Sequence, residues 1–486
     1  MHLLARSPLL PLAALLLAAC GPVDADRARQ GWLVEQLYRD NRVWLSRDPQ
    51  LLAWKYQAMA AAPYDFVRGS AGVWFADQAR SGADRVPTRF ALGPTTAQLL
   101  LVGDPHPENF GTMLPGPGPG PDQPGDPDAD ELRIELNDLD AAAFGPWGLD
   151  LRRAALGLSV LAGSLDGCDD TCIDEAVGAL AGGYADAATG ARDLAPGDDA
   201  ALGAVLSDRL EDARSEGPAR KKLDSYTTID ENGQRRLLRD AAPAADGTGM
   251  VAPTTQEQDQ LARLAGQLVA AGPADFRLLD AVRRYGSGVA SLPVVRYVLL
   301  WDRGQQGPED DDLLNLREVV DPPTLPGLGG SVPGLFDSQA DRAGRAPALV
   351  WSVADADALM TGLTDGEQTF KATSWSSWFQ RVDRVKLAGR WDEGSLGPAD
   401  LAALGAAMGG LLAQAHGRAP TASGTAAGPA LAAELKQRRT ELVEETVAAA
   451  QADRSRALAD HALFVDALQS YGPLLGAELP TEGVAP

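Results

Sequence analysis

Hydrophobic residues recur at helical spacing over residues 26–62, and this pattern predicts two helices near the N-terminus. Pro63 ends this block, because proline cannot continue a helix. Shorter apolar runs at 98–102 and 132–136 have the length of strands, and residues 150–165 have the pattern of a buried helix. The apolar positions of the first block are Trp32, Leu33, Leu37, Val43, Trp44, Leu45, Leu51, Leu52, Tyr56 and Met59.

The rest of the chain combines long helical stretches with few strands, so the predicted fold class is α+β with a large helical content. We find no internal repeat. Residues 115–130 are an acidic, low-complexity stretch of Pro and Gly that cannot pack into a core. In chain order, the pattern then predicts mostly helix over 171–271, a hairpin of strands 294–301 and 313–320 around an acidic turn at 309–312, a Pro- and Gly-rich loop over 322–347, and helices over 398–416 and 428–471.

Length and charge narrow the function classes. A chain of 486 residues can bury a large core, in one two-lobed unit or in two domains. It has 43 basic and 67 acidic residues, which give a formal net charge of −24. Non-specific nucleic-acid binding needs basic patches that displace counterions, so we expect no nucleic-acid partner.

The first residues have the features of an export signal. Arg6 precedes an apolar run, Leu9 to Ala19, that is too short to cross a bilayer as a helix. Small residues precede Cys20, which predicts a signal peptide of residues 1–19 and lipidation of the Cys20 thiol. A misassigned start or a buried N-terminal helix is the alternative. Because Gly21 follows instead of Asp, we expect a lipid-anchored protein of the cell envelope, on the outer membrane and facing the periplasm.

The remaining cysteines agree with export. With Cys20 lipidated, only Cys168 and Cys172 are left, and an even pair in an exported chain predicts a local disulfide. Two free thiols one helical turn apart are the alternative. A zinc site would need more ligands, and the mature chain has few histidines.

The most specific chemical signal lies between residues 103 and 140. Asp104 and Asn109 have the Asp-x-x-x-x-Asn spacing of a kinase catalytic loop. An aspartate in this position accepts the proton of an attacking hydroxyl, and the asparagine binds Mg²⁺. Asp138 follows a predicted strand, as the metal-binding aspartate of kinases does, and Asp140 offers a second carboxylate.

Simpler interpretations of these residues stay open. Aspartate, proline and asparagine are common in loops, and Asp138 and Asp140 would also suit the cap of a following segment. A lone histidine such as His106 more often orients a loop than binds a ligand. Glu108 and Asp138 resemble the carboxylate pair of a glycosidase, but that reading depends on their separation. The sequence has no Gly-x-Ser-x-Gly elbow and no His-Glu-x-x-His motif.

Six segments resemble, in the same order, the motifs of a bacterial family called domain of unknown function 2252. The resemblance covers most of the mature chain. The segments are Pro63-Tyr64-Asp65-Phe66-Val67-Arg68-Gly69, Gly103-Asp104-Pro105-His106-Pro107-Glu108-Asn109-Phe110-Gly111, Asn137-Asp138-Leu139-Asp140, Gly145-Pro146-Trp147, Asp150-Leu151-Arg152-Arg153 and Ala413-Gln414-Ala415-His416-Gly417-Arg418.

The family is grouped with protein-kinase-like folds, and its loop is similar to the Gly-Asp-x-His-x-x-Asn loop of aminoglycoside phosphotransferases. The resemblance implies a two-lobed, protein-kinase-like fold with Asp104 as catalytic base and with Asn109 and Asp138 as Mg²⁺ ligands. It also implies supporting roles for Arg68, His106, Asp150 and His416.

Two departures from the kinase pattern affect the nucleotide site. The matching glycine-rich region follows the catalytic loop, which indicates a permuted lobe order. Gly286, Gly288 and Ser291 are the expected phosphate-binding residues, with a plain glycine-rich turn as the alternative. Pro293 stands where relatives tend to carry Gly, and it cannot donate an N–H. On the next strand, Arg317 replaces the lysine of relatives and keeps its charge with a different reach.

We therefore expect a kinase-like phosphotransferase or nucleotide-binding lipoprotein that uses Mg²⁺ and an ATP-like nucleotide on a small-molecule or envelope substrate. Because ATP is scarce in the periplasm, a catalytically degenerate, pseudokinase-like binding protein is the alternative, and a purely structural envelope protein ranks below both. The predicted segments are a signal peptide (1–19), a helical segment after Cys20 (20–62), the catalytic-loop and metal-loop segment (63–165), a helical region (166–275), a β-lobe with the phosphate loop (276–330) and a C-terminal helical part (331–486).

Overall fold

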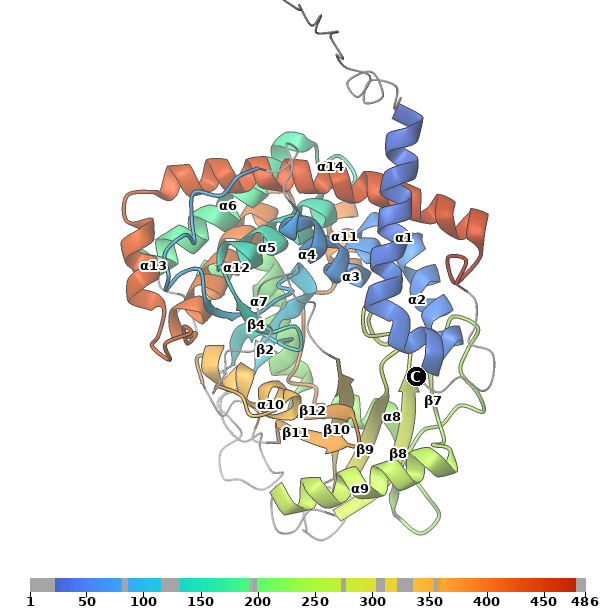
Figure 1. The fold of residues 1–486 in the computed structure, drawn as a ribbon. Coiled ribbons are helices and arrows are strands. Elements are labelled where there is room, and N and C mark those ends of the chain that lie inside the picture. The colour runs from blue at the N-terminus through green and yellow to red at the C-terminus, as the bar shows by residue number, and fades with distance from the viewer. Residues whose placement is uncertain are drawn as a thin grey trace, which may run out of the picture.

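A computed structural model of the protein has a mixed α+β fold, as predicted, with most helices on one side and a six-stranded sheet on the other (Figure 1). Among the described residues, no helix has both the length and the apolar character needed to cross a membrane. The predicted signal peptide and Cys20 lie outside the described residues. The structure describes residues 22–80, 86–114, 132–192, 194, 199–271, 277–302, 311–320, 335–353, 357 and 359–477.

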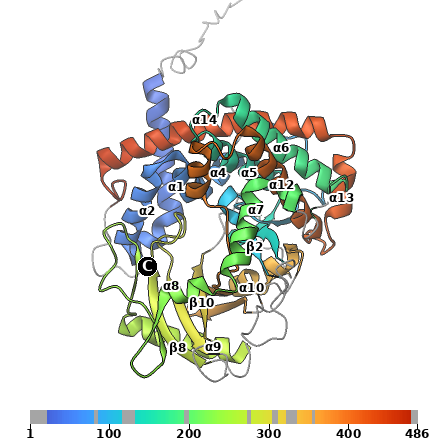
Figure 2. The same cartoon turned by 180° about the vertical axis from the view of Figure 1, so that it is seen from behind.

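The helical side includes the two predicted N-terminal helices, α1 and α2. The long helix α14 runs along the outside and packs against α1 (Figure 1). In the view from behind, α7 lies between α12 and the strand β2 (Figure 2). The helices are α1 (Pro22–Arg47), α2 (Pro49–Ala61), α3 (Pro63–Gly69), α4 (Ala71–Ala79), α5 (Gly148–Ala162), α6 (Asp170–Ala188), α7 (Asp199–Glu216), α11 (Arg384–Asp392), α12 (Pro398–Arg418), α13 (Gly428–Leu435) and α14 (Arg439–Tyr471), and β2 is Phe110–Met113.

Helices α6 and α12 approach closely because glycines lie at their contact. A Cβ atom on Gly183 would lie 2.2 Å from the Ala406 carbonyl oxygen, and one on Gly409 would lie 1.9 Å from the Leu180 carbonyl oxygen. Any larger residue would push the two helices apart. The start of α6 is capped by Asp169 and carries the predicted disulfide between Cys168 and Cys172, which is formed.

Two short antiparallel strand pairs position the chemically specific loops. Strand β1 (Leu99–Leu101) pairs with β4 (Ala143–Gly145), and β2 pairs with β3 (Arg133–Leu136). The strands predicted at 98–102 and 132–136 are therefore confirmed. The catalytic-loop segment follows β1 and includes the 3₁₀ turn η1 (Pro107–Asn109), whereas the segment with Asp138 follows β3.

The larger sheet is antiparallel, with strand order β11-β12-β10-β9-β8-β7. Alternate residues of its strands face opposite sides, as strand geometry requires. One side packs against α9, and the other packs against α8 and the hairpin β5–β6. These elements are β5 (Thr227–Ile229), β6 (Arg235–Leu237), β7 (Gly249–Val251), β8 (Arg277–Tyr285), β9 (Arg296–Asp302), β10 (Asp312–Val319), β11 (Thr361–Asp365), β12 (Gln368–Ser374), α8 (Lys221–Tyr226), α9 (Thr255–Ala271) and α10 (Gln339–Val350).

The structure confirms the β9–β10 hairpin and corrects four other predictions. The segment 171–271 also contains β5, β6 and β7, which are too short for a clear alternating pattern. The loop predicted over 322–347 ends in helix α10, because Ser338 caps it and its buried alanines pack against β11 and β12. The helix predicted over 428–471 is broken at Gln437, which has a positive φ of 63°. The strands β11 and β12 also lie in the part expected to be helical, and they complete the sheet.

Candidate functional site

Most of the predicted site residues line one cavity between the helical side and the sheet. The cavity has a volume of about 230 Å³. It adjoins a wider cleft of about 720 Å³, with which it shares part of its lining. The predicted residues that line the smaller cavity are Arg68, Asp104, His106, Asn109, Asp138, Asp140, Gly288, Ser291 and Arg317.

A glycine and a buried arginine hold Asp104 at this cavity. Gly103 has a φ of 93°, and a Cβ atom there would lie 2.2 Å from the Ala141 carbonyl oxygen, so the turn requires glycine. Arg153, with 1% of its side chain exposed, donates from Nε to Asp104 Oδ1 at 2.7 Å. Asp104 Oδ2 lies 4.0 Å from His106 Nε2. The carboxylate is therefore fixed through Oδ1, and its residue lines the cavity.

Asp150 supports this loop from behind and is fully buried. Its carboxylate accepts hydrogen bonds from the backbone N–H groups of Val102 at 2.6 Å and Gly103 at 3.0 Å. His416 Nε2 lies 3.0 Å from Asp150 Oδ2, and His416 Nδ1 lies 2.8 Å from the Tyr184 hydroxyl. Burial raises the pKa of that hydroxyl, and the charge of Asp150 adds to the effect, so it stays protonated and donates. These contacts match the supporting roles expected for Asp150 and His416.

The loop itself is closed by hydrogen bonds to the Asp104 carbonyl oxygen. His106 N donates to it at 2.9 Å and Asn109 Nδ2 at 2.8 Å. The Asn109 side-chain oxygen therefore has no competing role within the loop. Burial lowers the pKa of His106 to about 4, so its ring is neutral at pH 7 and supports the loop without charge.

Asp138 and Asp140 contact two cations of the sheet. Arg317 donates to Asp138 with N···O distances of 3.0 and 3.2 Å, and it also pairs with Asp140. Lys371 on β12 pairs with Asp140 as well. Burial acts to raise the pKa of Asp138, but the charges of Arg317 and Lys371 outweigh it and hold that pKa well below its usual range. The Asp138 carboxylate is therefore ionised at neutral pH.

The sheet presents a row of cations to the cavity. In the strand register, Arg317 lies directly opposite Arg296 on one side and Lys371 on the other, so the three side chains share one face. Arg284 continues the row, because its neighbour Arg283 pairs with Tyr297 in the register and antiparallel order then places Arg284 beside Arg296. Like charges at directly opposite positions repel, so this row needs negative charge nearby.

Arg296 is buried, and among the described residues it has no carboxylate partner. It donates instead to the hydroxyls of Ser287 and Ser291 in the glycine-rich segment. Burial lowers the pKa of Arg296 well below its usual value, and the charges of Arg317 and Arg284 lower it further. The Arg296 guanidinium and the two serine hydroxyls of this segment therefore lie together at the cavity.

The glycine-rich segment forms the turn between β8 and β9. Gly286 and Gly288 both have positive φ, 69° and 79°. Gly288 and Ser291 line the cavity, whereas Gly286 packs against Thr248, where a Cβ atom would lie 2.6 Å away. Gly286 therefore shapes the turn without lining the cavity. Pro293 lies at the end of the turn, away from the cavity lining.

Arg68 supports the other side of the catalytic loop through its charge. Its Nη1 lies 2.8 Å from Glu108 Oε2 and 3.6 Å from Asp65 Oδ1, and all three residues are buried. Glu108 is therefore part of an ion pair. This arrangement fixes the loop and does not resemble a free acid of a glycosidase.

Sequence reasoning missed three residues of the site: Arg296 and Lys371, which line the cavity or the cleft, and the buried Arg153, which holds Asp104. Arg153 stands one helical turn after Asp150 in a motif that was recognised, and this spacing was the available signal. Arg296 immediately follows the glycine-rich turn. Lys371 lies between Phe370 and Ala372 and is the charged residue of strand β12. Only the strand register reveals that this lysine stands next to Arg317.

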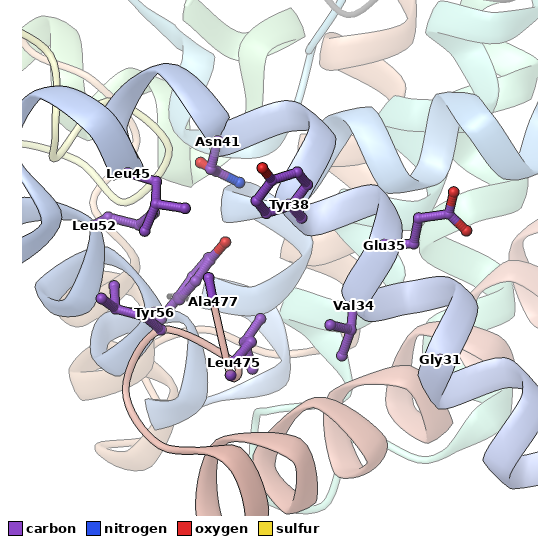
Figure 3. Close-up of a pocket in the computed structure, with 12 residues that line it drawn as sticks. Gly31, Val34, Glu35, Tyr38, Asn41, Leu45, Leu52, Tyr56, Leu475 and Ala477 are labelled. Carbon is purple, nitrogen blue, oxygen red and sulfur yellow. The ribbon is translucent and has the colours of Figure 1, made fainter. Parts of the chain in front are cut away.

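A second cavity of about 290 Å³ lies between α1, α2 and the segment that follows α14 (Figure 3). Its lining is mostly apolar, with Leu45, Leu52 and Tyr56 facing the space. Glu35 points away from it in Figure 3 and pairs with Arg39. Because convergent charged groups are absent from its described lining, we place the candidate functional site at the polar cavity.

A search for clusters of three or more His, Cys, Asp or Glu side chains in a metal-binding arrangement found none in the described part of the chain. A cation at the polar cavity would therefore need Asn109 beside the two carboxylates of Asp138 and Asp140.

Comparison with known proteins identifies a family but no function. The model of a family described as uncharacterized proteins conserved in bacteria (DUF2252) matches residues 47–467, which is most of the chain. No curated protein and no solved structure matches the chain.

Proposed function

The chain belongs to the DUF2252 family, and from this premise we propose that it is a kinase-like phosphotransferase that uses a nucleotide and Mg²⁺. The observation that carries the proposal is the shared cavity. Asp104, Asp138 and Arg317 come from a loop, a second loop and a strand that are far apart in sequence, and all three line it. A catalytic base, a metal ligand and a phosphate-binding cation are the parts that phosphoryl transfer requires.

The order of elements on the sheet supports a kinase-like arrangement. The glycine-rich turn joins β8 to β9, and the next strand, β10, carries the cation Arg317. Kinases use the same succession of glycine-rich loop and cationic strand position over the phosphates. We propose that the sheet and the helical side form the two lobes of such a fold in permuted order, since the catalytic loop comes first in the chain.

We propose that the nucleotide phosphates bind between the glycine-rich turn and the two cations of the row that line the smaller cavity, Arg296 and Arg317. Ser291 and Gly288 line this part of the cavity, and Arg296 has no acid partner there among the described residues. A phosphate group would supply the missing negative charge and accept hydrogen bonds from the guanidinium in its preferred geometry.

The donor set fits Mg²⁺. Two carboxylates, Asp138 and Asp140, line the same cavity as the Asn109 amide, and oxygen ligands of this kind suit a hard cation. Arg317 and Lys371 neutralise the carboxylates in the ligand-free protein. When phosphates are bound, these two cations have a second anionic partner, which frees the carboxylates for the metal. Bound Mg²⁺ supplies charge neutralisation of the phosphates.

The chemical step assigns one role to Asp104. The acceptor hydroxyl oxygen attacks the terminal phosphorus, the bond to the leaving diphosphate breaks, and Asp104 accepts the hydroxyl proton. Arg153 orients this carboxylate through Oδ1, and we assign proton acceptance to Oδ2, which accepts no such hydrogen bond from the described residues. We propose a small molecule or an envelope component as the acceptor. This proposal includes anchoring through lipidated Cys20 at the outer membrane.

A second candidate is a binding protein that has lost catalysis. It is favoured by the contacts of Arg317 and Lys371, which occupy the carboxylates expected to hold the metal. In this case a nucleotide or another anion binds, but no phosphate is transferred.

Thermal unfolding of the mature chain with ATP and Mg²⁺ tests the proposal. Saturating ligand at about 100-fold its Kd stabilises a protein by about 2.7 kcal/mol, so the melting temperature rises. We expect the rise to be lost in Arg296→Met and to lose its Mg²⁺ dependence in Asp138→Asn. Asp365→Asn, which alters an ion pair on β11 outside the cavity, is the matched control. No shift with any nucleotide in the wild type contradicts the transferase and leaves only a binding protein for another anion.

Turnover separates the two candidates. We expect wild-type protein to release phosphate from ATP slowly without an acceptor, and Asp104→Asn to keep the thermal shift while losing this release. If the wild type binds ATP but its release equals that of Asp104→Asn, the chain is a binding protein and not a transferase.

A further inference from the structure

The wide cleft beside the nucleotide cavity contains cations that the proposed reaction does not use. We propose that this cleft binds a second, anionic small molecule through Lys222, Arg284 and Arg381, with its flat or apolar part against Trp375. Binding of the anion stands on the cleft itself. We further assign this anion as the phosphoryl acceptor, and that assignment rests on the proposed function.

None of the three cations forms an ion pair within the described part of the chain. Lys222 Nζ donates to the Ser376 carbonyl oxygen at 2.6 Å, and the Arg284 guanidinium lies 4.4 Å from the Trp375 ring centre. Arg381 is exposed where the cleft meets the smaller cavity, and it lines both. Unpaired cations gathered in one place are unexpected in a chain with a net charge of −24.

The carboxylates that line the cleft already have partners, so they cannot neutralise these cations. Glu108 pairs with Arg68, and Asp138 pairs with Arg317. Asp383 accepts hydrogen bonds from backbone N–H groups in the first turn of α11. The remaining one, Asp357, accepts hydrogen bonds from the Ser374 backbone N–H at 2.8 Å and hydroxyl at 2.9 Å.

The cations of the cleft repel one another, and this repulsion acts on their pKa values. Burial lowers the pKa of Lys222 to about 8, the charge of Arg284 lowers it further, Glu216 opposes this, and Arg381 adds a smaller lowering effect. Burial likewise lowers the pKa of Arg284, with Arg381 adding to it. A bound anion would relieve this repulsion, so the cleft should bind negatively charged molecules more tightly than neutral ones.

An aromatic wall completes the cleft. The rings of Trp375 and Tyr226 lie 4.5 Å apart, and both residues line the space. Lys222 Nζ lies 5.6 Å from the Trp375 ring centre, on the same wall. A ligand with negative groups on a flat or apolar body would therefore contact the cations and the indole together. The volume of about 720 Å³ suits a small molecule.

Calorimetric titration of the mature chain with two probes tests the inference. Citrate presents carboxylates and inorganic pyrophosphate presents phosphates, so the two arms distinguish the source of the anion. At low ionic strength we expect at least one probe to bind, and its affinity to fall about tenfold or more in Arg284→Met and in Arg381→Met. Arg263→Met, which alters an ion pair on α9 outside the cleft, is expected to bind like the wild type.

Tryptophan fluorescence gives a second measurement at the same site. The probe that binds should change the emission of the wild type, and this change should be lost in Trp375→Phe. Arg381 is exposed, so its variant remains informative even if Arg284→Met fails to fold. Absence of binding by both probes, or binding that neither Arg284→Met nor Arg381→Met weakens, overturns the inference.

Failure of the anion-cleft inference and failure of the proposed transferase function give different results. Loss of the ATP thermal shift with citrate binding intact removes the transferase and leaves the anion cleft. Pyrophosphate binding that depends on Arg296 but not on Arg284 or Arg381 reports the nucleotide cavity and counts against the second site.

Discussion

The two walls of the cavity differ in how their charges are balanced. On the helical wall, Asp104 pairs with Arg153, while Asp138 and Asp140 pair with cations from the sheet. On the sheet wall, Arg284 and Arg296 have no carboxylate partner among the described residues. The carboxylates of the helical wall are therefore balanced by cations, whereas two cations of the sheet wall have no carboxylate in the described part of the chain to balance them.

This difference indicates where ligand-binding energy comes from. A buried cation without a partner reduces stability, because removing it from water is not offset. Proteins tolerate such groups mainly where a ligand supplies the missing charge. We therefore expect variants of the helical wall to reduce stability and variants of the sheet wall to reduce binding.

The largest expected effect is on the support of the helical wall. Asp150→Ala removes the acceptor of two backbone N–H groups and the partner of His416 in a fully buried site. We expect the free energy of unfolding to fall by about 3–5 kcal/mol, as when one member of a buried pair is removed. Urea denaturation measures this. Asp169→Ala, which removes a helix cap, should cost about 1 kcal/mol. An equal loss of unfolding free energy in the two variants would show that Asp150 stabilises the protein no more than an ordinary helix cap does.

The contact between the walls should have a smaller and pH-dependent effect. Arg317→Met leaves Asp138 without its closest cation, and we expect a loss of about 2 kcal/mol at pH 7 because the carboxylate is only partly buried. The folded pKa of Asp138 lies below its ordinary value of 3.8, so its contribution is present above that pH and is lost as the pH falls. The difference in the free energy of unfolding between the variant and the wild type should therefore be smaller at pH 3 than at pH 7. Urea denaturation at both pH values measures it.

Removing the unpaired cation Arg296 from the sheet wall should change the stability in the opposite direction. Arg296→Met removes a buried charge that lacks an acid partner, so we expect unfolding to require about 1 kcal/mol more free energy, or the same amount. ATP binding should be lost at the same time. Arg153→Met is the matched control, since this buried arginine is paired and its loss should destabilise. Destabilisation of equal size in both variants would remove the distinction between the walls.

The smallest expected effect concerns Lys222 in the wide cleft. Its pKa of about 8 rises when an anion binds, so binding takes up a proton above that pH. The charged groups that face it are Arg284, Arg381 and Glu216. We expect citrate affinity to weaken roughly threefold from pH 7.5 to pH 8.5. Calorimetry should find this dependence absent in Lys222→Met, and a pH-independent wild type would show that the lysine does not contact the anion.

The local sequence pattern was enough to predict elements that form through interactions between residues close together in the chain. Helical periodicity located α1, α2 and α12, and alternation with turn residues located the β9–β10 hairpin. The spacing of Asp104 and Asn109 placed both on one tight loop, because five residues cannot separate them far. The family resemblance added Asp150 and His416, whose buried contact joins residues that the pattern alone cannot relate.

Only the tertiary structure decided which distant charges face one another. Lys371 stands beside Arg317 because β12 pairs with β10, and a register shifted by one residue would turn it to the other side of the sheet. Helix α10 forms in a Pro- and Gly-rich stretch because packing of its buried face outweighs weak local propensity. Charge pairing and burial depend on through-space distance, which the order of residues along the chain does not contain.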